Sequence, residues 1–240
     1  ILQSLIMSRF NLETEITPDE VVYRETIQSE TEGVGHYEPL RHYSEVHLIL
    51  TPLPRGSGII YDSQCPPDSV EPQYIAQVMS ALQNSSHKGV LTGSKITDIK
   101  ITFISGKSHI KHTSGGDFRE AAMRALRCGL MHTSSILLEP YYAFVLQIPG
   151  NTLGRAMNDI RMMHGSFGEP EQQGSDYILR GKSPVSTMNS YQNTVAAYTG
   201  GNGKLFLEFA GYDRCHNTQE VVSRIGYDPE RDTDNTPDSI

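Results

Sequence analysis

The sequence predicts an α+β protein made of two consecutive βα sandwich domains. Segments with alternating apolar residues, typical of half-buried strands, recur along the chain together with segments whose apolar residues repeat at helical spacing. After residue 138 these segments follow the order strand–helix–strand–strand–helix–strand, which is that of a ferredoxin-like split βαβ domain. Hydrophobic residues make up 37% and charged residues 20% of the 240 residues, a globular composition.

Residues 1–20 predict the end of a preceding domain. Apolar residues recur at helical spacing over residues 1–6, those over 12–16 alternate as in a strand, and Thr17-Pro18-Asp19 breaks the pattern. Because the chain begins without Met inside the predicted helix, we expect it to be a piece of a longer protein.

Residues 21–138 are predicted to form the first complete domain. Residues 45–54 alternate as a half-buried strand does, and the turn at residues 55–58 predicts that residues 58–62 return as its hairpin partner. The remaining predicted elements are a helix after a capping box at Asp68 and Glu71, a strand over 96–104, a polar loop over 105–116 and a helix over 118–130.

Residues 139–215 are predicted to form the second domain. Leu205, Leu207 and Phe209 are expected to form its last strand. We expect residues 216–240 to be an acidic, mobile tail, because the chain from residue 228 onward is rich in Asp, Thr and Pro. The other predicted elements are strands over 141–148, 166–171 and 177–180, a helix over 153–163 and a helix N-capped by Ser183.

Charge is distributed unevenly along the chain. The formal net charge of −8 argues against a protein coated with basic surface for nucleic acid. Residues 13–45 hold nine acidic residues and two arginines, and residues 217–240 hold six and two, whereas residues 88–112 hold five lysines and one aspartate. This asymmetry suggests one local contact with an anionic partner. Lysines on a solvated strand face are the alternative.

The polar loop over residues 105–116 is the sharpest candidate for a binding function. It offers hydroxyls, two imidazoles and two ammonium groups without acidic residues. Lysine binds phosphate as a point charge, and imidazoles and hydroxyls bond to the 2′-hydroxyls or bases of folded RNA. On this chemistry an RNA contact and a solvated surface loop both remain open.

Other chemistries find little support in the pattern. No GxxxxGK[ST] phosphate loop occurs, so we expect no nucleotide hydrolysis by this chain. His109 and His112 lie three residues apart on an extended loop, a spacing that disfavours zinc. Cys128 falls in an apolar helix, where a packed thiol is the default, and no G-x-S-x-G elbow occurs. An odd cysteine count suits a reduced, cytoplasmic setting, and no apolar run is long enough to span a bilayer.

Five short segments resemble elongation factor G and keep its order and spacing. VYRETI at residues 22–27 resembles the passage from the third to the fourth domain of that family, and PLPRGSG at 52–58 resembles a fourth-domain turn. Residues 106–118 match the Gly, His and Phe spacing of the fourth-domain tip loop. LLEP at 137–140 resembles the entry into the fifth domain, and GGNG at 200–203 resembles its glycine-rich turn.

Two regions differ from the subfamilies that the chain resembles. Residues 35–43 read GHYEPLRHY where elongation factor G carries GGRGQYGH. The loop at 106–119 with its DFR ending is similar to tetracycline-resistance ribosomal protection proteins, but Ile110-Lys111-His112 replace their Ser-Pro-Val run. A resistance factor, a divergent elongation factor G, an uncharacterised relative and a stand-alone RNA-binding protein without GTPase all remain open.

The resemblance implies a partner and a site. It implies a third-domain remnant over 1–20, a ribosome-contacting arm (domain IV) over 21–138 and a fifth domain over 139–215, acting as a cytoplasmic monomer without membrane attachment. The arm would contact ribosomal RNA or the transfer RNA–messenger RNA region. Its tip loop would comprise Lys107, Ser108, His109, Ile110, Lys111, His112, Thr113 and Ser114, and the neighbouring loop would supply His36, Tyr37, Arg41 and His42.

The resemblance also implies that this chain has no catalytic residues of its own. No cofactor or metal is expected in it, whereas GTP and magnesium are expected in a GTPase domain outside the chain.

Overall fold

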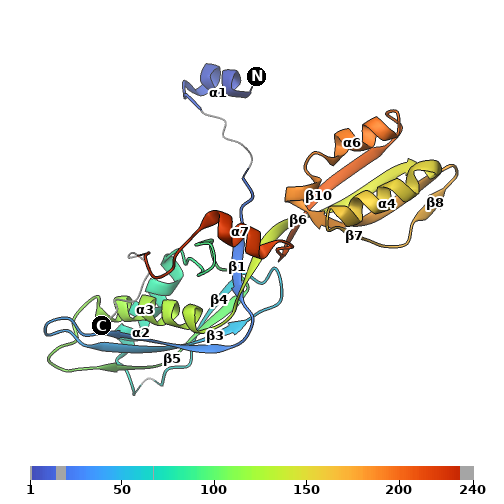
Figure 1. Cartoon of the computed structure of the whole chain (residues 1–240). Coiled ribbons are helices and arrows are strands. Elements are labelled where there is room, and N and C mark those ends of the chain that lie inside the picture. Colours follow the sequence, from blue (N-terminus) through green and yellow to red (C-terminus); the bar gives the residue numbers. More distant parts are fainter. Residues whose placement is uncertain (1, 15–19, 67, 233–240) are drawn as a thin grey trace.

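The computed structural model describes residues 2–14, 20–66 and 68–232, and it contains two α+β domains (Figure 1). Helix α1 (Leu2–Phe10) precedes them, as the apolar spacing of its sequence predicts. Residues 11–14 do not form the predicted strand, whose remaining residues, 15 and 16, lie outside the described ones. No helix in the described part of the chain has the length and apolar character of a membrane span.

The first domain is a sheet covered on one face by two helices. Strands β2 (Thr31–Tyr37), β3 (Ser44–Pro52) and β5 (Ile99–Ser108) are antiparallel neighbours, and β4 (Ile59–Ser63) runs parallel to β5 at the edge. Helices α2 (Pro72–Asn84) and α3 (Asp117–His132) bury the apolar side of the sheet. The largest fully buried side chains of this core include Leu48, Leu50, Leu82, Ile99, Ile101, Phe103, Phe118 and Leu130.

The hairpin predicted for residues 45–62 was wrong. Strand β4 does not pair with β3, because β5 lies between them and pairs with both. Buried Asp98 explains the path of the chain: its Oδ1 accepts hydrogen bonds from the amides of Gly56 (3.1 Å) and Gly58 (3.0 Å). The turn is thus bound to the residue just before β5, and the chain leaves it along the far side of β5.

The capping box predicted at Asp68 and Glu71 was also wrong. Glu71 is the N-cap of α2 but makes no side-chain capping hydrogen bond. Pro72 occupies the first helical position, where its missing N–H leaves no donor unsatisfied. The Glu71 carboxylate instead accepts a hydrogen bond from the Ser108 hydroxyl at 3.2 Å.

The second domain has the predicted ferredoxin-like topology. Its strands lie in the order β10 (Lys204–Arg214), β6 (Ser135–Pro149), β9 (Asp176–Pro184) and β7 (Ser166–Phe167), with β8 (Glu171–Gln173) also on β9. The helical elements that follow these strands are η1 (Gly150–Thr152), α4 (Leu153–Met162), α5 (Val185–Met188) and α6 (Tyr191–Tyr198).

The helix predicted to start at Ser183 is displaced and divided. Ser183 is a buried residue of β9, and Pro184 is the N-cap of α5. The helical stretch is broken between Met188 and Tyr191, which leaves two short helices. Met188 and Val195 are fully buried, as predicted, so the apolar spacing survived an incorrect boundary.

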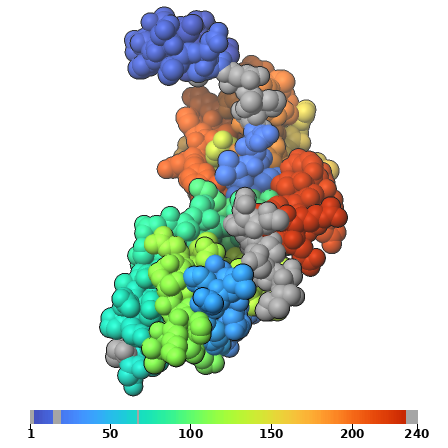
Figure 2. All heavy atoms as spheres, turned by 90° about the vertical axis from the view of Figure 1, so that its left-hand side faces the viewer, coloured from blue at the N-terminus to red at the C-terminus, as the bar shows by residue number. Residues whose placement is uncertain are grey.

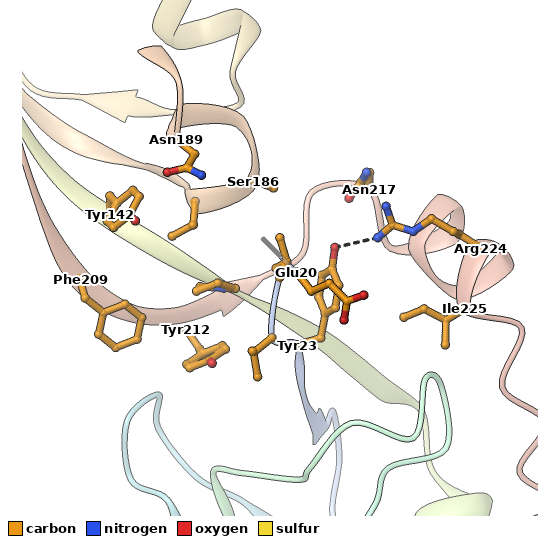
Figure 3. Close-up of a pocket in the computed structure, with 14 residues that line it drawn as sticks. Glu20, Tyr23, Tyr142, Ser186, Asn189, Phe209, Tyr212, Asn217, Arg224 and Ile225 are labelled. Carbon is orange, nitrogen blue, oxygen red and sulfur yellow. Dashed lines mark hydrogen bonds between the residues drawn. The ribbon is translucent and has the colours of Figure 1, made fainter. Parts of the chain in front are cut away.

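The predicted last strand forms as β10, but part of its alternating apolar face is exposed. Leu205 packs against the core, but Leu207 is 37% and Phe209 is 59% exposed, because the short α6 covers only the start of β10. Phe209 lines a cleft of about 900 Å³ at the domain junction, together with Tyr142, Tyr212 and Arg224 (Figure 3). In this cleft the Arg224 guanidinium donates to the Tyr23 hydroxyl at 3.3 Å, and Glu20 also belongs to the lining.

The expectation of a mobile tail over residues 216–240 was wrong for the part that the structure describes. Residues Thr218–Ile225 form helix α7, in which Val221 is buried against Tyr23, Leu137 and Cys215. The acidic composition after residue 228 concealed this short amphipathic segment. Residues 226–232 continue beyond α7 and contact the first domain, and residues 233–240 lie outside the described ones.

Glycines 33 and 35 let α3 lie directly on β2. A Cβ atom at Gly35 would overlap the Ala121 carbonyl oxygen, and one at Gly33 would overlap that of Ala125. We expect Gly35→Ala to lower the free energy of unfolding by about 1–3 kcal/mol, because the helix must move away from the sheet.

Gly154→Ala on α4 is the matched control, because no atom lies within 4 Å of the added methyl group. It should raise stability by about 0.5–1 kcal/mol by lowering the entropy of the unfolded chain. Urea unfolding followed by circular dichroism measures both, and equal effects would contradict the close approach of α3.

Candidate nucleic-acid interface

The two predicted loops lie together at the end of the first domain that is remote from the second (Figure 1). Tyr37 pairs with Ser44, and Ser44 pairs with Ser108, so that β2, β3 and β5 end at the same level. Figure 2 looks onto this end, where the residues near 40 (blue) lie beside those near 115 (yellow-green). Lys107 and Ser108 belong to β5, which runs beyond its predicted end at residue 104.

Hydrogen bonds join the two loops. The Tyr43 amide donates to the His112 carbonyl oxygen (2.9 Å), and the Thr113 hydroxyl donates to the Tyr43 carbonyl oxygen (2.7 Å). The Thr113 oxygen also accepts from the His109 amide at 2.7 Å. Thr113 was predicted as an RNA contact, and in the structure its hydroxyl fixes the shape of the loops.

His42 and Ser114 likewise have partners within the protein. His42 Nδ1 lies 2.9 Å from Asp117 Oδ1 and 3.0 Å from the Ser114 hydroxyl oxygen. Asp117 is 3% exposed and is the first residue of α3, where the helix dipole favours a carboxylate. The neighbouring loop is therefore attached to the start of the helix as well as to the tip loop.

Aromatic side chains within the neighbouring loop pack against each other and against Arg124 of α3. The rings of Tyr37 and His42 meet edge to face with centroids 6.1 Å apart, and those of His36 and Tyr43 do so at 5.3 Å. The guanidinium of Arg124 lies 4.8 Å from the Tyr37 ring centroid and donates to the His36 carbonyl oxygen at 3.0 Å. Sequence reasoning missed Arg124, whose position in α3 gave no sign that it reaches β2.

Lys107 forms an ion pair with Glu45, although the tip loop itself contains no acidic residue. Its Nζ lies 2.8 Å from Glu45 Oε1 on β3. Hydrogen bonds from Lys107 and His47 lower the pKa of Glu45 to about 2. Glu32 and Glu45 hydrogen-bond the two ring nitrogens of His47 and raise its pKa despite partial burial. Alternation along β3 places Glu45 and His47 on the same face of the sheet. This alternation is the one sequence pattern from which their contact could have been predicted.

Cations and apolar side chains project from the two loops. Ile110 is 102% and Leu40 is 96% exposed. Lys111 and Arg41 are exposed, and within the described part of the chain no acidic side chain lies within ion-pair distance of either. Arg41 has a φ of 74°, a left-handed conformation that costs free energy for a residue other than glycine.

His109 is oriented by its own loop. The Lys111 amide donates to His109 Nδ1 at 3.3 Å, so the neutral ring carries its proton on Nε2. The ring of His112 lies 4.6 Å from that of His109 between centroids. The remaining nitrogen of His109 is thus a hydrogen-bond donor that a partner can meet.

Within the described part of the chain there is no complete site for metal binding or for a catalytic thiol. The described residues contain no group of three or more His, Cys, Asp or Glu side chains arranged around a metal position. Cys128 Sγ lies 3.3 Å from His132 Nδ1, one helical turn later, a contact that the sequence analysis did not foresee. No carboxylate of the described chain orients His132, so the arrangement that activates a catalytic thiol is incomplete.

Two family models match the chain. The model of elongation factor G, domain IV matches residues 19–134, and that of the elongation factor G C-terminus matches residues 136–221. A crystal structure of a protein from Thermus thermophilus superposes with a TM-score of 0.76 at 25% identity, over 92% of this chain and 34% of that one.

Curated relatives include two tetracycline resistance proteins. TetP of Clostridium perfringens is 28% identical over 232 residues, and TetS of Listeria monocytogenes is 29% identical over 211 residues. These alignments cover 95% and 87% of this chain, but only 35% and 33% of TetP and TetS. The chain thus spans about a third of the length of these relatives.

The pairing of Glu45 gives a testable pH dependence. Because its pKa is lowered from an ordinary value of 4.5 to about 2, its contribution to stability is present above pH 4.5 and is lost as the pH falls toward 2. Glu45→Gln should lower the unfolding free energy at pH 7 by about 1 kcal/mol. Urea unfolding at pH 7 and pH 3 checks this, and the two proteins should differ less at pH 3. A constant difference would contradict the pairing.

Proposed function

Because the chain belongs to the elongation factor G family, we propose that it is the ribosome-binding C-terminal region of an elongation factor G-like translational GTPase. The family membership rests on matches to domain IV and to the C-terminus over residues 19–134 and 136–221. The rest of a longer protein would supply the GTPase with its GTP and magnesium. The chain itself would bind the ribosome without turning over nucleotide, as a cytoplasmic monomer.

The observation that carries this proposal is the tip of the first domain. Two loops from three strands are joined by hydrogen bonds, and they present Lys111, Arg41 and the Nε2–H donor of His109 outward. The ammonium and guanidinium groups suit phosphate oxygens, and the imidazole suits a base edge or a 2′-hydroxyl. A preformed surface of this kind binds RNA without the entropic cost of ordering the loops.

Contacts within the protein distinguish two groups among the predicted site residues. Lys107, His42, Thr113 and Ser114 have partners that fix the loops, and we propose that they position the site. His109, Ile110, Lys111 and Arg41 are proposed to make the contacts with ribosomal RNA or with the transfer RNA–messenger RNA region.

A second candidate function is ribosomal protection against tetracycline. It is favoured by TetP and TetS, both of which are named tetracycline resistance proteins. The same scaffold serves both functions, and the outcome at the drug site would depend on Ile110, Lys111 and His112, which occupy the centre of the tip loop.

The division of roles predicts unequal effects of two lysine substitutions. Lys111→Ala should weaken binding to ribosomes in co-sedimentation and reduce the dependence of log K on log salt by about 1, because one phosphate contact is lost. Lys107→Ala should have a smaller effect, since Glu45 already neutralises Lys107. Lys204→Ala on the second domain is the control for the loss of one positive charge. Equal effects of all three substitutions would contradict the proposal that the tip contacts the ribosome.

Tetracycline protection is tested with a chimera in which this chain replaces the corresponding third of TetP. We expect the chimera to bind ribosomes and to restore in vitro translation at an inhibitory tetracycline concentration. Binding without restored translation would overturn the second function and leave the first standing. Loss of binding in a folded chimera would contradict both.

A further inference from the structure

The segment after α7 returns to the first domain. Residues 226–232 lie beyond the end of the family match at residue 221 and contact α3 and the chain before β5. The Tyr227 ring packs over Gly93, where a Cβ would lie 3.0 Å from Cε2 of the ring. We call residues 226–232 the return segment.

The return segment rests on a hairpin that holds two of the five lysines of the basic stretch. The backbones of Lys88 and Lys95 form an antiparallel β-bridge across this hairpin (residues 88–95). The hairpin is fixed from inside by buried Glu25, whose carboxylate accepts hydrogen bonds from the Leu91, Thr92 and Ser94 amides. Its shape therefore does not depend on the return segment alone.

Arg127 of α3 is a buried cation whose described partners are neutral oxygens. It is 3% exposed, and in the described part of the chain no acidic side chain lies within ion-pair distance of its guanidinium. It donates to the carbonyl oxygens of Lys88 and Gly89 and, from the return segment, to the Tyr227 hydroxyl (2.9 Å) and the Pro229 carbonyl oxygen (3.1 Å). Its buried Nε has no hydrogen-bond partner. A buried charge satisfied only by neutral oxygens is unusual, because its desolvation is incompletely compensated.

A carboxylate of the return segment is linked to this cation through the Tyr227 hydroxyl. Asp232 Oδ2 lies 3.2 Å from Lys88 Nζ and 2.8 Å from the Tyr227 hydroxyl, and the Asp232 side chain is 12% exposed. Since Arg127 donates to the same hydroxyl, one chain of hydrogen bonds runs from Arg127 through Tyr227 to Asp232. The Asp232 carboxylate thus contacts Lys88 of the hairpin directly and Arg127 of α3 through the Tyr227 hydroxyl.

We propose that Lys88, Lys95 and Arg127 form a second anion-binding site, which takes a backbone phosphate of RNA and which Asp232 occupies in the free chain. The choice of RNA rests on the proposed function. A phosphodiester has two non-bridging oxygens that share one negative charge, and these can meet Lys88 and a guanidinium whose planar fork suits such geometry. The return segment is an acidic competitor that keeps this site closed until RNA displaces it.

The test compares two aspartates of the return segment. Asp232→Asn and Asp228→Asn each remove one negative charge, but Asp228 pairs with Arg231 and does not contact Lys88. The probe is a single-stranded RNA oligonucleotide, with affinity measured over a salt series. Asp232→Asn should bind several-fold more tightly, with a slope of log K against log salt steeper by about 0.7, which is one phosphate contact to a single strand. Asp228→Asn should leave the slope unchanged.

A second variant tests the site itself. Adding Lys88→Met to Asp232→Asn should abolish the gain, whereas adding Lys204→Met, which removes an exposed lysine of β10, should not. Equal gains from the two aspartate variants, or a gain that survives Lys88→Met, would overturn the proposal.

Measurements on ribosomes separate this proposal from the function of the tip. Lys111→Ala lowers ribosome binding if the proposed function is correct, whether or not the second site exists. If Lys111→Ala has no effect while Asp232→Asn still binds RNA more tightly, the proposed function fails and the second site stands.

Discussion

The long strand β6 is the element on which the arrangement of the molecule depends. Residues 135–138 of β6 pair with β1 (Arg24–Ile27), and its later residues pair with β9 and β10, so that one strand belongs to the junction and to the second domain. Just after the segment that pairs with β1, the fully buried Glu139 accepts hydrogen bonds from the His216 amide (2.8 Å), the His216 ring (2.6 Å) and the Ser186 hydroxyl (3.1 Å). Three donors compensate this buried carboxylate for the loss of water, and their removal would leave a buried acceptor unsatisfied. The direction of the second domain is thus set by the strand and by the polar cluster around Glu139.

Strand β1 connects β6 to the first domain. Its backbone pairs with β6, while the side chain of Glu25 organises the hairpin at residues 88–95 through amide hydrogen bonds. That hairpin contacts Arg127 of α3, and α3 begins at Asp117, which holds His42 of the neighbouring loop. Polar contacts at Arg127 and Asp117, at two positions on α3, therefore connect the domain junction to the tip through the body of this helix.

Alternation and helical spacing predicted the core, because these patterns report burial directly. Val46, Leu48 and Leu50 are fully buried as expected, and so are Met188 and Val195 despite a misplaced helix boundary. Pairing between strands was not predictable in the same way. The turn at residues 55–58 is held by Asp98, some forty residues later, and a local pattern carries no record of such a partner. The tip loop was identified by residue type, but the roles of its members depend on contacts with β3 and α3 that the sequence does not display.

The basic stretch at residues 88–112 shows why a local charge count overstates a binding site. Lys107 pairs with Glu45, Lys100 with Asp62 at 2.8 Å, and Lys88 with Asp232, an acidic residue 144 positions later in the chain. Only Lys95 and Lys111 lack an acidic partner within the described structure, and they lie in different parts of the first domain. In an acidic protein, intramolecular pairing neutralises most cations and leaves attraction for RNA at a few points. The proposed RNA contact at the preformed tip needs no more than this, because the net charge of −8 disfavours binding elsewhere and a few well-placed contacts would then decide the position of a bound RNA.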